Sequence, residues 1–143
     1  MKIKAIVEMP AYTRYKYEAK NGKLILDRIL RVDVPCNYGY FPGTLEKDGD
    51  PADCFIFSYM PLQPLAEINI EILGGFACVD NGVQDDKLFA KIYGDFYINI
   101  GAYDVALIYN YLNTYKEGFN IIKQLSKEEA IQVYQNSLVA DWS

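Results

Sequence analysis

Histidine is absent from this sequence of 143 residues, and its absence excludes several kinds of catalytic site. There can be no Ser-His-Asp triad, no Cys-His dyad and no histidine-ligated zinc or iron centre. Any catalysis by this chain must therefore use carboxylates, lysine, arginine, tyrosine, cysteine or a hard metal ion.

Cysteine and long apolar runs are also scarce. The three cysteines, Cys36, Cys54 and Cys78, are too widely spaced for a CxxC motif or a disulfide framework, so we expect reduced thiols in a core. No run approaches the roughly 20 apolar residues of a membrane-spanning helix, and the N-terminus lacks the apolar stretch of a signal peptide. We therefore expect a cytoplasmic protein that has no membrane partner.

Basic residues are outnumbered by acidic ones. The chain has 14 Lys and Arg against 19 Asp and Glu, a net charge of −5. Phosphate backbones repel such a chain, so we expect no nucleic-acid partner. The length predicts one domain over residues 1–143 that can build its own core. The apolar fraction of 51% is typical of globular proteins rather than disordered ones.

The first two-thirds of the chain shows the alternating pattern of β-strands. We expect strands at residues 2–8, 14–19, 23–30, 54–59, 67–79 and 87–93, and an irregular segment at residues 34–51. Asn21-Gly22 predicts a hairpin between the second and third strands. Gly74-Gly75 predicts a bend or bulge in the fifth.

The last third has the pattern of helices. Val105, Ile108, Tyr109 and Leu112 recur every three or four residues, which predicts an amphipathic helix over residues 102–115. Ser126 begins a capping box that predicts a second helix to about residue 137. Strands followed by helices indicate an α+β fold, and a small closed barrel is the favoured form of the sheet.

Two acidic turns lie at strand ends. The first, residues 48–53, contains Asp48, Asp50 and Asp53 around Gly and Pro; the second, residues 80–87, contains Asp80 and Asp85. Each turn alone is explained more simply as a solvated surface loop. If both meet at one end of the sheet, repulsion between their carboxylates would favour binding of divalent cations. Oxygen ligands without histidine or thiolate favour Mg²⁺ or Mn²⁺.

Phosphate-binding loops are missing as well. There is no P-loop and no GxGxxG motif, so a bound phosphate would have to be held by side chains and metal. The candidates are the cations Lys16, Arg28, Lys87 and Lys116 and the donors Tyr38 and Tyr115. For any single one of them, an ordinary surface side chain is the simpler interpretation.

Together these segments resemble the soluble (family I) inorganic pyrophosphatases. The first acidic turn matches the family pattern D-G-D-P-x-D and the second matches D-x4-D-x-K. Further matches are Val7-Glu8-Met9-Pro10, Tyr15-Lys16-Tyr17-Glu18, Leu26-Asp27-Arg28, Pro35-Cys36-Asn37-Tyr38-Gly39-Tyr40 and Tyr115-Lys116. Seven segments in the same order are hard to produce by chance, although the chain is shorter than typical members.

The resemblance implies a fold, a reaction and a partner. The fold would be a small OB-like, five-stranded closed β-barrel with the C-terminal helices packed outside. The reaction would be hydrolysis of inorganic pyrophosphate to two phosphates by a metal-activated water, with Mg²⁺ as cofactor and Mn²⁺ as a substitute. The chain would form a homo-oligomer, with a hexamer favoured because bacterial members are commonly hexamers.

The resemblance also implies roles for individual residues. Asp50 would orient and deprotonate the attacking water, and Arg28, Lys16 and Tyr38 would complete the catalytic group. The implied metal ligands are Asp48, Asp53, Asp80, Asp85 and Glu8. The implied substrate-binding residues are Lys16, Arg28, Tyr38, Lys87, Tyr115 and Lys116. Glu18 and Asp27 would orient these side chains without contacting the metal or the substrate themselves.

Two other functions remain open at this point. The same metals and cations would serve a Mg²⁺-dependent hydrolase of nucleotides or other organic diphosphates. An inactive relative that acts as an acidic binding module is the third possibility, and it is disfavoured because every implied catalytic position keeps its residue.

Overall fold

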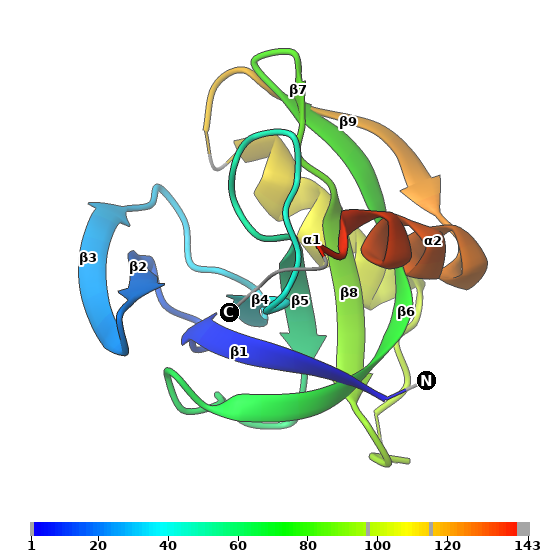
Figure 1. The fold of residues 1–143 in the computed structure, drawn as a ribbon, viewed down its shortest axis with the longest axis horizontal. Coiled ribbons are helices and arrows are strands. Elements are labelled where there is room, and N and C mark those ends of the chain that lie inside the picture. Colours follow the sequence, from blue (N-terminus) through cyan, green and yellow to red (C-terminus); the bar gives the residue numbers. More distant parts are fainter. Residues whose placement is uncertain (1, 97, 115, 140–143) are drawn as a thin grey trace.

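The computed structural model describes residues 2–96, 98–114 and 116–139. It contains a seven-stranded sheet, a separate two-stranded sheet and two helices (Figure 1). The elements in chain order are β1 (Ile3–Met9), β2 (Tyr15–Lys20), β3 (Lys23–Ile29), β4 (Asn37–Tyr40), β5 (Asp53–Phe57), β6 (Glu67–Asp80), β7 (Val83–Gln84), β8 (Lys87–Ile92), α1 (Ala102–Thr114), β9 (Phe119–Leu125) and α2 (Lys127–Ser137).

Five strands of the large sheet form a closed ring. Their hydrogen-bonded order is β1-β4-β5-β8-β6, and β6 pairs back with β1. The pairs in the ring are antiparallel except for the parallel pair β5–β8. β6 is long enough, at 14 residues, to pair with β7 and β9 as well. The predicted mixture of strands and helices is therefore present, with a sheet that returns to its first strand.

The glycines of β6 mark the irregularity that the sequence predicts. The register between β6 and β8 shifts between Ile72 and Gly74. A Cβ atom on Gly74 would lie 2.8 Å from the ring of Phe89, and one on Gly75 would lie 2.9 Å from the carbonyl oxygen of Lys87. Glycine is needed here because two strands approach more closely than a side chain allows.

Two expectations about secondary structure were wrong. The segment 34–51 contains β4, and the last third contains β9 between the two helices. The first three of the four β4 residues are buried, so no alternation of apolar and polar residues marks it. In β9 the neighbours Ile121 and Ile122 interrupt the period of two, and only its end residues are buried. Short or edge strands of this kind carry a weak sequence pattern.

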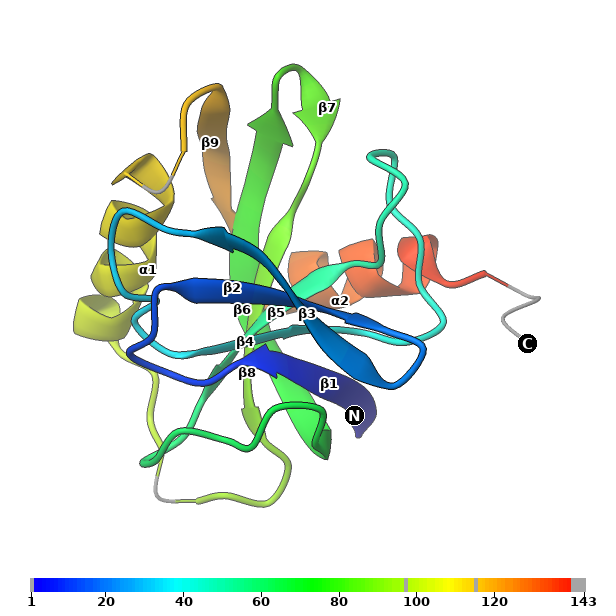
Figure 2. The same cartoon turned by 90° about the vertical axis from the view of Figure 1, so that its left-hand side faces the viewer.

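The two helices cover different flanks of the sheet (Figure 2). α1 packs against β9, and α2 packs against β6. The capping box at the start of α2 is present, because Ser126 Oγ accepts from the Glu129 amide and Glu129 Oε1 accepts from the Ser126 amide, both at 3.1 Å. α1 buries Ile108, Tyr111 and Leu112; the expected contact residue Tyr109 is 46% exposed.

The core consists of two apolar clusters. One contains Phe55, Phe76 and Phe89 under α1, and the other contains Val7 and Phe41 near α2. Burial of each such side chain stabilises the fold by about 2 kcal/mol. All three cysteines are free and buried, as the sequence predicts.

The β2–β3 hairpin forms a sheet of its own beside the ring, at the left in Figure 1. Asn21 and Gly22 have positive φ angles of 52° and 74°, the conformation of the predicted two-residue turn. The hairpin register places Lys16 opposite Arg28. Two cations that are distant in sequence are thereby brought together next to the ring.

Candidate active site

The parallel pair β5–β8 determines where the acidic segments meet. Asp53 is the first residue of β5 and Lys87 the first of β8, and the two are register partners. Because parallel strands begin at the same edge of a sheet, the loops that lead into them lie side by side. These are the first acidic loop, residues 44–53, and the second acidic loop, residues 80–87.

The Lys87 ammonium group joins the two acidic loops. Its Nζ lies 2.5 Å from Asp53 Oδ2 and 3.2 Å from Asp85 Oδ1. Its side chain is 5% exposed, and those of Asp53 and Asp85 are 18% and 7% exposed. The two loops therefore meet as predicted, and the buried Lys87 ammonium lies between the carboxylates of Asp53 and Asp85.

Aromatic groups complete the surroundings of Lys87. Its ammonium donates to the Tyr38 hydroxyl at 2.9 Å. It also lies 5.4 Å from the centre of the Tyr38 ring and 5.7 Å from that of Phe119, within the range of cation–π attraction. The Tyr38 ring packs edge-on against Phe55 at 5.0 Å. The apolar core thus fixes the tyrosine that contacts this cation.

A bulge in β1 turns Glu8 toward the same region. β1 pairs with β4 at Val7 and at Met9, and the register shifts between them. An extra residue in a strand changes the direction of its side chain. The opposing glycine, Gly39, is required because a Cβ atom there would lie 2.0 Å from the carbonyl oxygen of Ile6.

A cavity of about 460 Å³ collects most of the predicted site residues. Eleven of those residues line it: Glu8, Lys16, Glu18, Tyr38, Asp48, Asp50, Asp53, Asp80, Asp85, Lys87 and Lys116. They come from β1, β2, β4, both acidic loops and the segment after α1. On the far side of the second acidic loop, the Lys116 ammonium forms an ion pair with Asp80.

Two predicted residues, Arg28 and Asp27, are not among the described residues that line the cavity. Arg28 is the register partner of Lys16, and its charge lies close enough to Tyr111 to affect that hydroxyl. Asp27 lies near Lys16, with its Oδ2 3.9 Å from the Lys16 ammonium. Tyr115 lies outside the described residues.

Several of the carboxyl groups titrate above their ordinary range. The pKa of Asp50, which is exposed at the rim of the cavity, is raised by partial desolvation of its carboxyl group and then by the negative charges of Asp48 and Asp53. The pKa of Asp85 is raised to about 6, because burial outweighs the opposing effect of the Lys87 ammonium. Desolvation and like charges both favour the neutral form of an acid. Further positive charge at this end of the sheet would therefore stabilise the ionised carboxylates.

The residues present fit a hard divalent cation chemically. Their donors are carboxylate oxygens, which Mg²⁺ and Mn²⁺ prefer. Within residues 2–96, 98–114 and 116–139, however, no three acidic or cysteine side chains converge closely enough to hold an ion. Instead, ammonium groups neutralise Asp53, Asp85 and Asp80. A metal ion bound by these carboxylates would displace the lysines, which would then be available to another anion such as phosphate.

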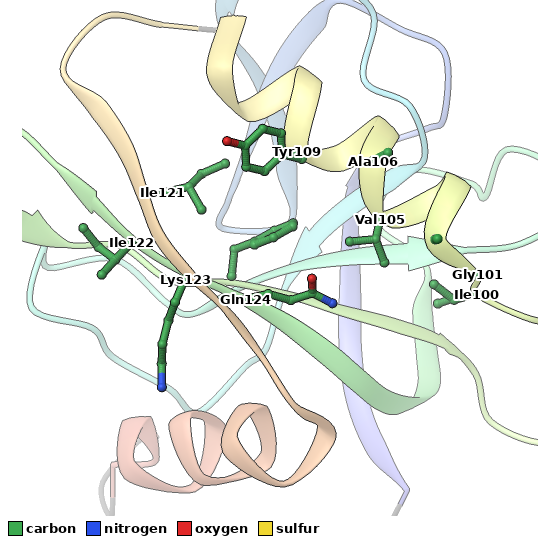
Figure 3. A pocket seen from close by; sticks show the side chains of 11 residues that line it. Ile100, Gly101, Val105, Ala106, Tyr109, Ile121, Ile122, Lys123 and Gln124 are labelled. Carbon is green, nitrogen blue, oxygen red and sulfur yellow. The ribbon is translucent and has the colours of Figure 1, made fainter.

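A second cavity, of about 670 Å³, has a different character. It lies between α1 and β9, and its lining includes Val105, Tyr109 and Ile121 (Figure 3). Among the described residues that line it, Lys123 has the one charged side chain. These residues offer no carboxylate to a cation and little to a phosphate, so the smaller acidic cavity is the candidate active site.

Sequence reasoning missed several residues near the site. Lys20 and Tyr40 line the cavity. Glu46 contacts the second acidic loop, since Glu46 Oε2 accepts from the Asp86 amide at 3.2 Å. Tyr40 stands in a segment already matched to the family, so it could have been found. Glu46 could not, because nothing in sequence links it to a residue 40 positions away.

Glu46 has an unusual environment for a carboxyl group. Its pKa is raised to about 8, first by burial and then by the negative charges of Asp86 and Asp53. Asp86 itself is 4% exposed. Glu46 and Asp86 therefore form a second pair of neighbouring acidic residues, and Asp86 follows directly after Asp85.

The sequence matches a known protein family and its members. The family model described as "Inorganic pyrophosphatase" matches residues 5–141. The inorganic pyrophosphatase of Nanoarchaeum equitans is 39% identical over 92 residues, which cover 63% of this chain and 58% of that protein. That of Mycoplasma genitalium is 38% identical over 94 residues, which cover 63% and 51%. The match thus spans little more than half the length of these curated relatives.

Solved structures resemble the chain over more of its length. An inorganic pyrophosphatase from Neisseria gonorrhoeae has a TM-score of 0.87 and 27% identity, covering 95% of this chain and 88% of that one. The enzyme from Thermus thermophilus has a TM-score of 0.88 at 23% identity, with coverage of 95% and 88%, and supports the fold alone. With a family match over nearly its whole length and a fold to agree, the chain belongs to the inorganic pyrophosphatase family.

Proposed function

We propose that this chain hydrolyses inorganic pyrophosphate to two orthophosphates with the help of divalent cations, Mg²⁺ in the first place and Mn²⁺ as a substitute. The observation that carries the proposal is the meeting of the two acidic loops around Lys87 in a cavity walled by lysine and tyrosine. Family membership and the matching relatives, which are named inorganic pyrophosphatases, support the same reaction.

The carboxylates divide into candidate ligands and a candidate base. Asp48, Asp53, Asp80, Asp85 and Glu8 would hold the cations. When bound, these cations would supply positive charge that neutralises the pyrophosphate oxygens and activates water. The raised pKa of Asp50 supports its role as the group that accepts the proton of the attacking water, because a base works best when its pKa approaches the working pH.

The cations of the chain itself would hold the substrate. Lys16, Lys87 and Lys116 line the cavity with Tyr38, and Arg28 stands opposite Lys16 in the hairpin. Their fixed positive charge and hydrogen bonds would stabilise negative charge on the transferred and leaving phosphoryl groups. Arg28 suits a two-pronged contact with phosphate, whereas the lysines act as point charges. Glu18 and Asp27 would orient Lys16, and Tyr115 would add a further donor.

The proposal also covers the type of sheet, the cellular location and the assembly state. The closed ring of five strands supports the interpretation of the sheet as an OB-like barrel. None of the helices described is long and apolar enough to cross a membrane. A cytoplasmic location stays a prediction based on the sequence, and a homo-oligomer, with a hexamer favoured, stays one based on family resemblance.

The experiment that tests the function is steady-state phosphate release from pyrophosphate and from a panel of nucleoside di- and triphosphates. We expect pyrophosphate to be preferred in kcat/KM by far more than tenfold. A preference for a nucleotide by more than about tenfold, or roughly 1.4 kcal/mol in transition-state binding, would reverse the assignment. Phosphate release from none of the substrates would favour an inactive relative.

A further inference from the structure

We propose that Glu46 is a positioning residue whose side chain fastens the first acidic loop to the second and thereby sets the affinity of the site for divalent cations. The inference rests on the proposed function, which makes the carboxylates of these loops metal ligands. Glu46 touches neither substrate nor metal in this account. It acts through the residues that do, and the contacts of its backbone and side chain carry the argument.

The backbone of Glu46 closes the turn that presents the first group of aspartates. Its amide donates to the Asp50 carbonyl at 2.9 Å, and its carbonyl accepts from the Gly49 amide at 3.0 Å. Within the same turn, Asp48 Oδ1 accepts from the Asp50 amide at 3.0 Å. Any displacement of Glu46 therefore moves Asp48 and Asp50 with it.

The side chain of Glu46 points out of this turn and contacts the other loop. Glu46 Oε2 accepts from the Asp86 backbone amide at 3.2 Å. The acceptor belongs to the first acidic loop and the donor to the second, between Asp85 and Lys87. This contact is a direct hydrogen bond between the loops that involves neither Lys87 nor a bound cation.

The second loop is held by its own hydrogen bonds where Glu46 meets it. The Asp86 side chain is buried, and its two oxygens accept from the Cys78 amide at 3.0 Å and from Gln84 Nε2 at 2.7 Å. The Asp85 amide donates to the Cys78 carbonyl at 3.0 Å. Glu46 thus fastens a turn with exposed aspartates to a loop that β6 already holds in place.

Placing Glu46 next to Asp86 has a cost, because two acidic side chains approach each other in a partly buried region. An alanine at position 46 would remove that repulsion. The Glu46 side chain nevertheless supplies an acceptor oxygen and is long enough to place it within hydrogen-bond distance of the Asp86 amide. Groups that hold metal ligands in position without touching the metal typically change metal affinity by about 10- to 100-fold when they are removed.

The test compares the full-length wild type with Glu46→Ala, Glu46→Asp and Glu46→Gln by calorimetric titration with Mg²⁺ alone. Aspartate keeps the acidic group but is one methylene too short, whereas glutamine keeps the reach and an acceptor oxygen. We expect the Kd for Mg²⁺ to rise about tenfold in the Ala and Asp variants and to stay within about twofold of wild type for Gln. Glu128→Ala, on the exposed face of α2, is the control and should bind like wild type.

Two other readouts separate positioning from a general loss of structure. Hydrogen exchange at the Asp86 amide should be slow in metal-free wild type and in Glu46→Gln, and faster in Glu46→Asp. In phosphate-release assays, the Mg²⁺ concentration for half-maximal activity should follow the change in Kd, while KM for pyrophosphate at saturating Mg²⁺ stays within about twofold. The Gln and Asp variants decide the matter even if the Ala variant does not fold.

Three results would overturn the inference: unchanged Mg²⁺ affinity in both Ala and Asp variants, wild-type affinity in Asp alone, or a Gln variant as weak as Asp. The second would mean that the acidic group matters rather than its reach, and the third would mean that an acceptor of the correct reach is not sufficient. Failure of the proposed function looks different, because wild type would then release no phosphate from pyrophosphate while the Mg²⁺ titrations and amide exchange still report on the contact.

Discussion

The two acidic loops contain similar residues but differ in how those residues are held. In the first loop, Asp48 and Asp50 are exposed. In the second loop, Asp85 and Asp86 are only 5% and 4% exposed, and each accepts a hydrogen bond or contacts an ammonium group. Carboxylates in water keep their freedom to react, whereas buried ones need partners to be tolerated. The difference indicates that the first loop presents reactive groups and the second holds the arrangement together.

The largest effect should follow from changing the exposed loop. Asp50→Asn removes the candidate base but keeps the size of the side chain. We expect kcat for pyrophosphate to fall about 1,000-fold, with the melting temperature and Mg²⁺ affinity close to wild type. Asp33→Asn, which removes another exposed carboxylate that pairs with Arg14, should keep full activity. An Asp50→Asn enzyme with near-normal turnover would show that Asp50 is not the base.

The next largest effect should follow from a change to the buried second loop. Lys87→Met would leave Asp53 and Asp85 without the ammonium that lies between them. Removing one partner of a buried ion pair costs about 3–5 kcal/mol, which corresponds to a fall in melting temperature of roughly 10 °C for a chain of this size. Thermal unfolding in metal-free buffer measures the change.

The matched control is Lys4→Met, which breaks an exposed pair with Glu67. Such surface pairs contribute at most about 1 kcal/mol, so the control should unfold close to the wild-type temperature. Equal effects of the two substitutions would mean that the second loop is no more tightly held than an ordinary surface.

Metal should link the two loops, and its effect on stability is of intermediate size. At a Mg²⁺ concentration near 100 times Kd, binding stabilises the folded chain by about 2.7 kcal/mol, or roughly 5–10 °C in melting temperature. We expect EDTA to reverse this gain. A melting temperature that does not respond to Mg²⁺ would mean that the two loops do not share a cation.

The smallest effect tests a carboxyl group far from both loops. The Lys123 ammonium and the Ser126 amide lower the pKa of Glu129 from 4.5 to about 2. Because the folded-state pKa is below the ordinary value, the stabilisation is present above about pH 4.5 and is lost as pH falls through about 2. Glu129→Gln should therefore lower the melting temperature by at most about 2 °C at pH 7, since the group is exposed. The difference should shrink toward zero as pH falls through about 2; a difference that keeps its pH 7 size there would mean that the charge of Glu129 is not its source.

Several elements of the fold and of the candidate site were predictable because they depend on local pattern. Asn21-Gly22 specified a hairpin, and Ser126 with Glu129 specified the start of α2. The aspartates of the acidic turns were found from their spacing. The buried strand β4 and the edge strand β9 were missed because neither shows the alternation of a half-exposed strand.

What sequence could not supply was the detail of long-range contact. That Lys87 lies between Asp53 and Asp85 depends on the parallel pairing of β5 with β8, which no local pattern encodes. The same holds for Glu46 and Asp86, which lie in separate loops. Contacts of this kind are set by how the whole chain packs, and they decide which carboxylates are free to react.

The measurement that tests the account most directly is phosphate release from pyrophosphate by the purified chain, with Mg²⁺ and with EDTA. We expect rapid release with Mg²⁺, loss of release with EDTA and recovery when Mg²⁺ is restored. Absence of release in Mg²⁺, or a rate that EDTA leaves unchanged, would contradict the claim that the two acidic loops form a metal-dependent site for pyrophosphate hydrolysis.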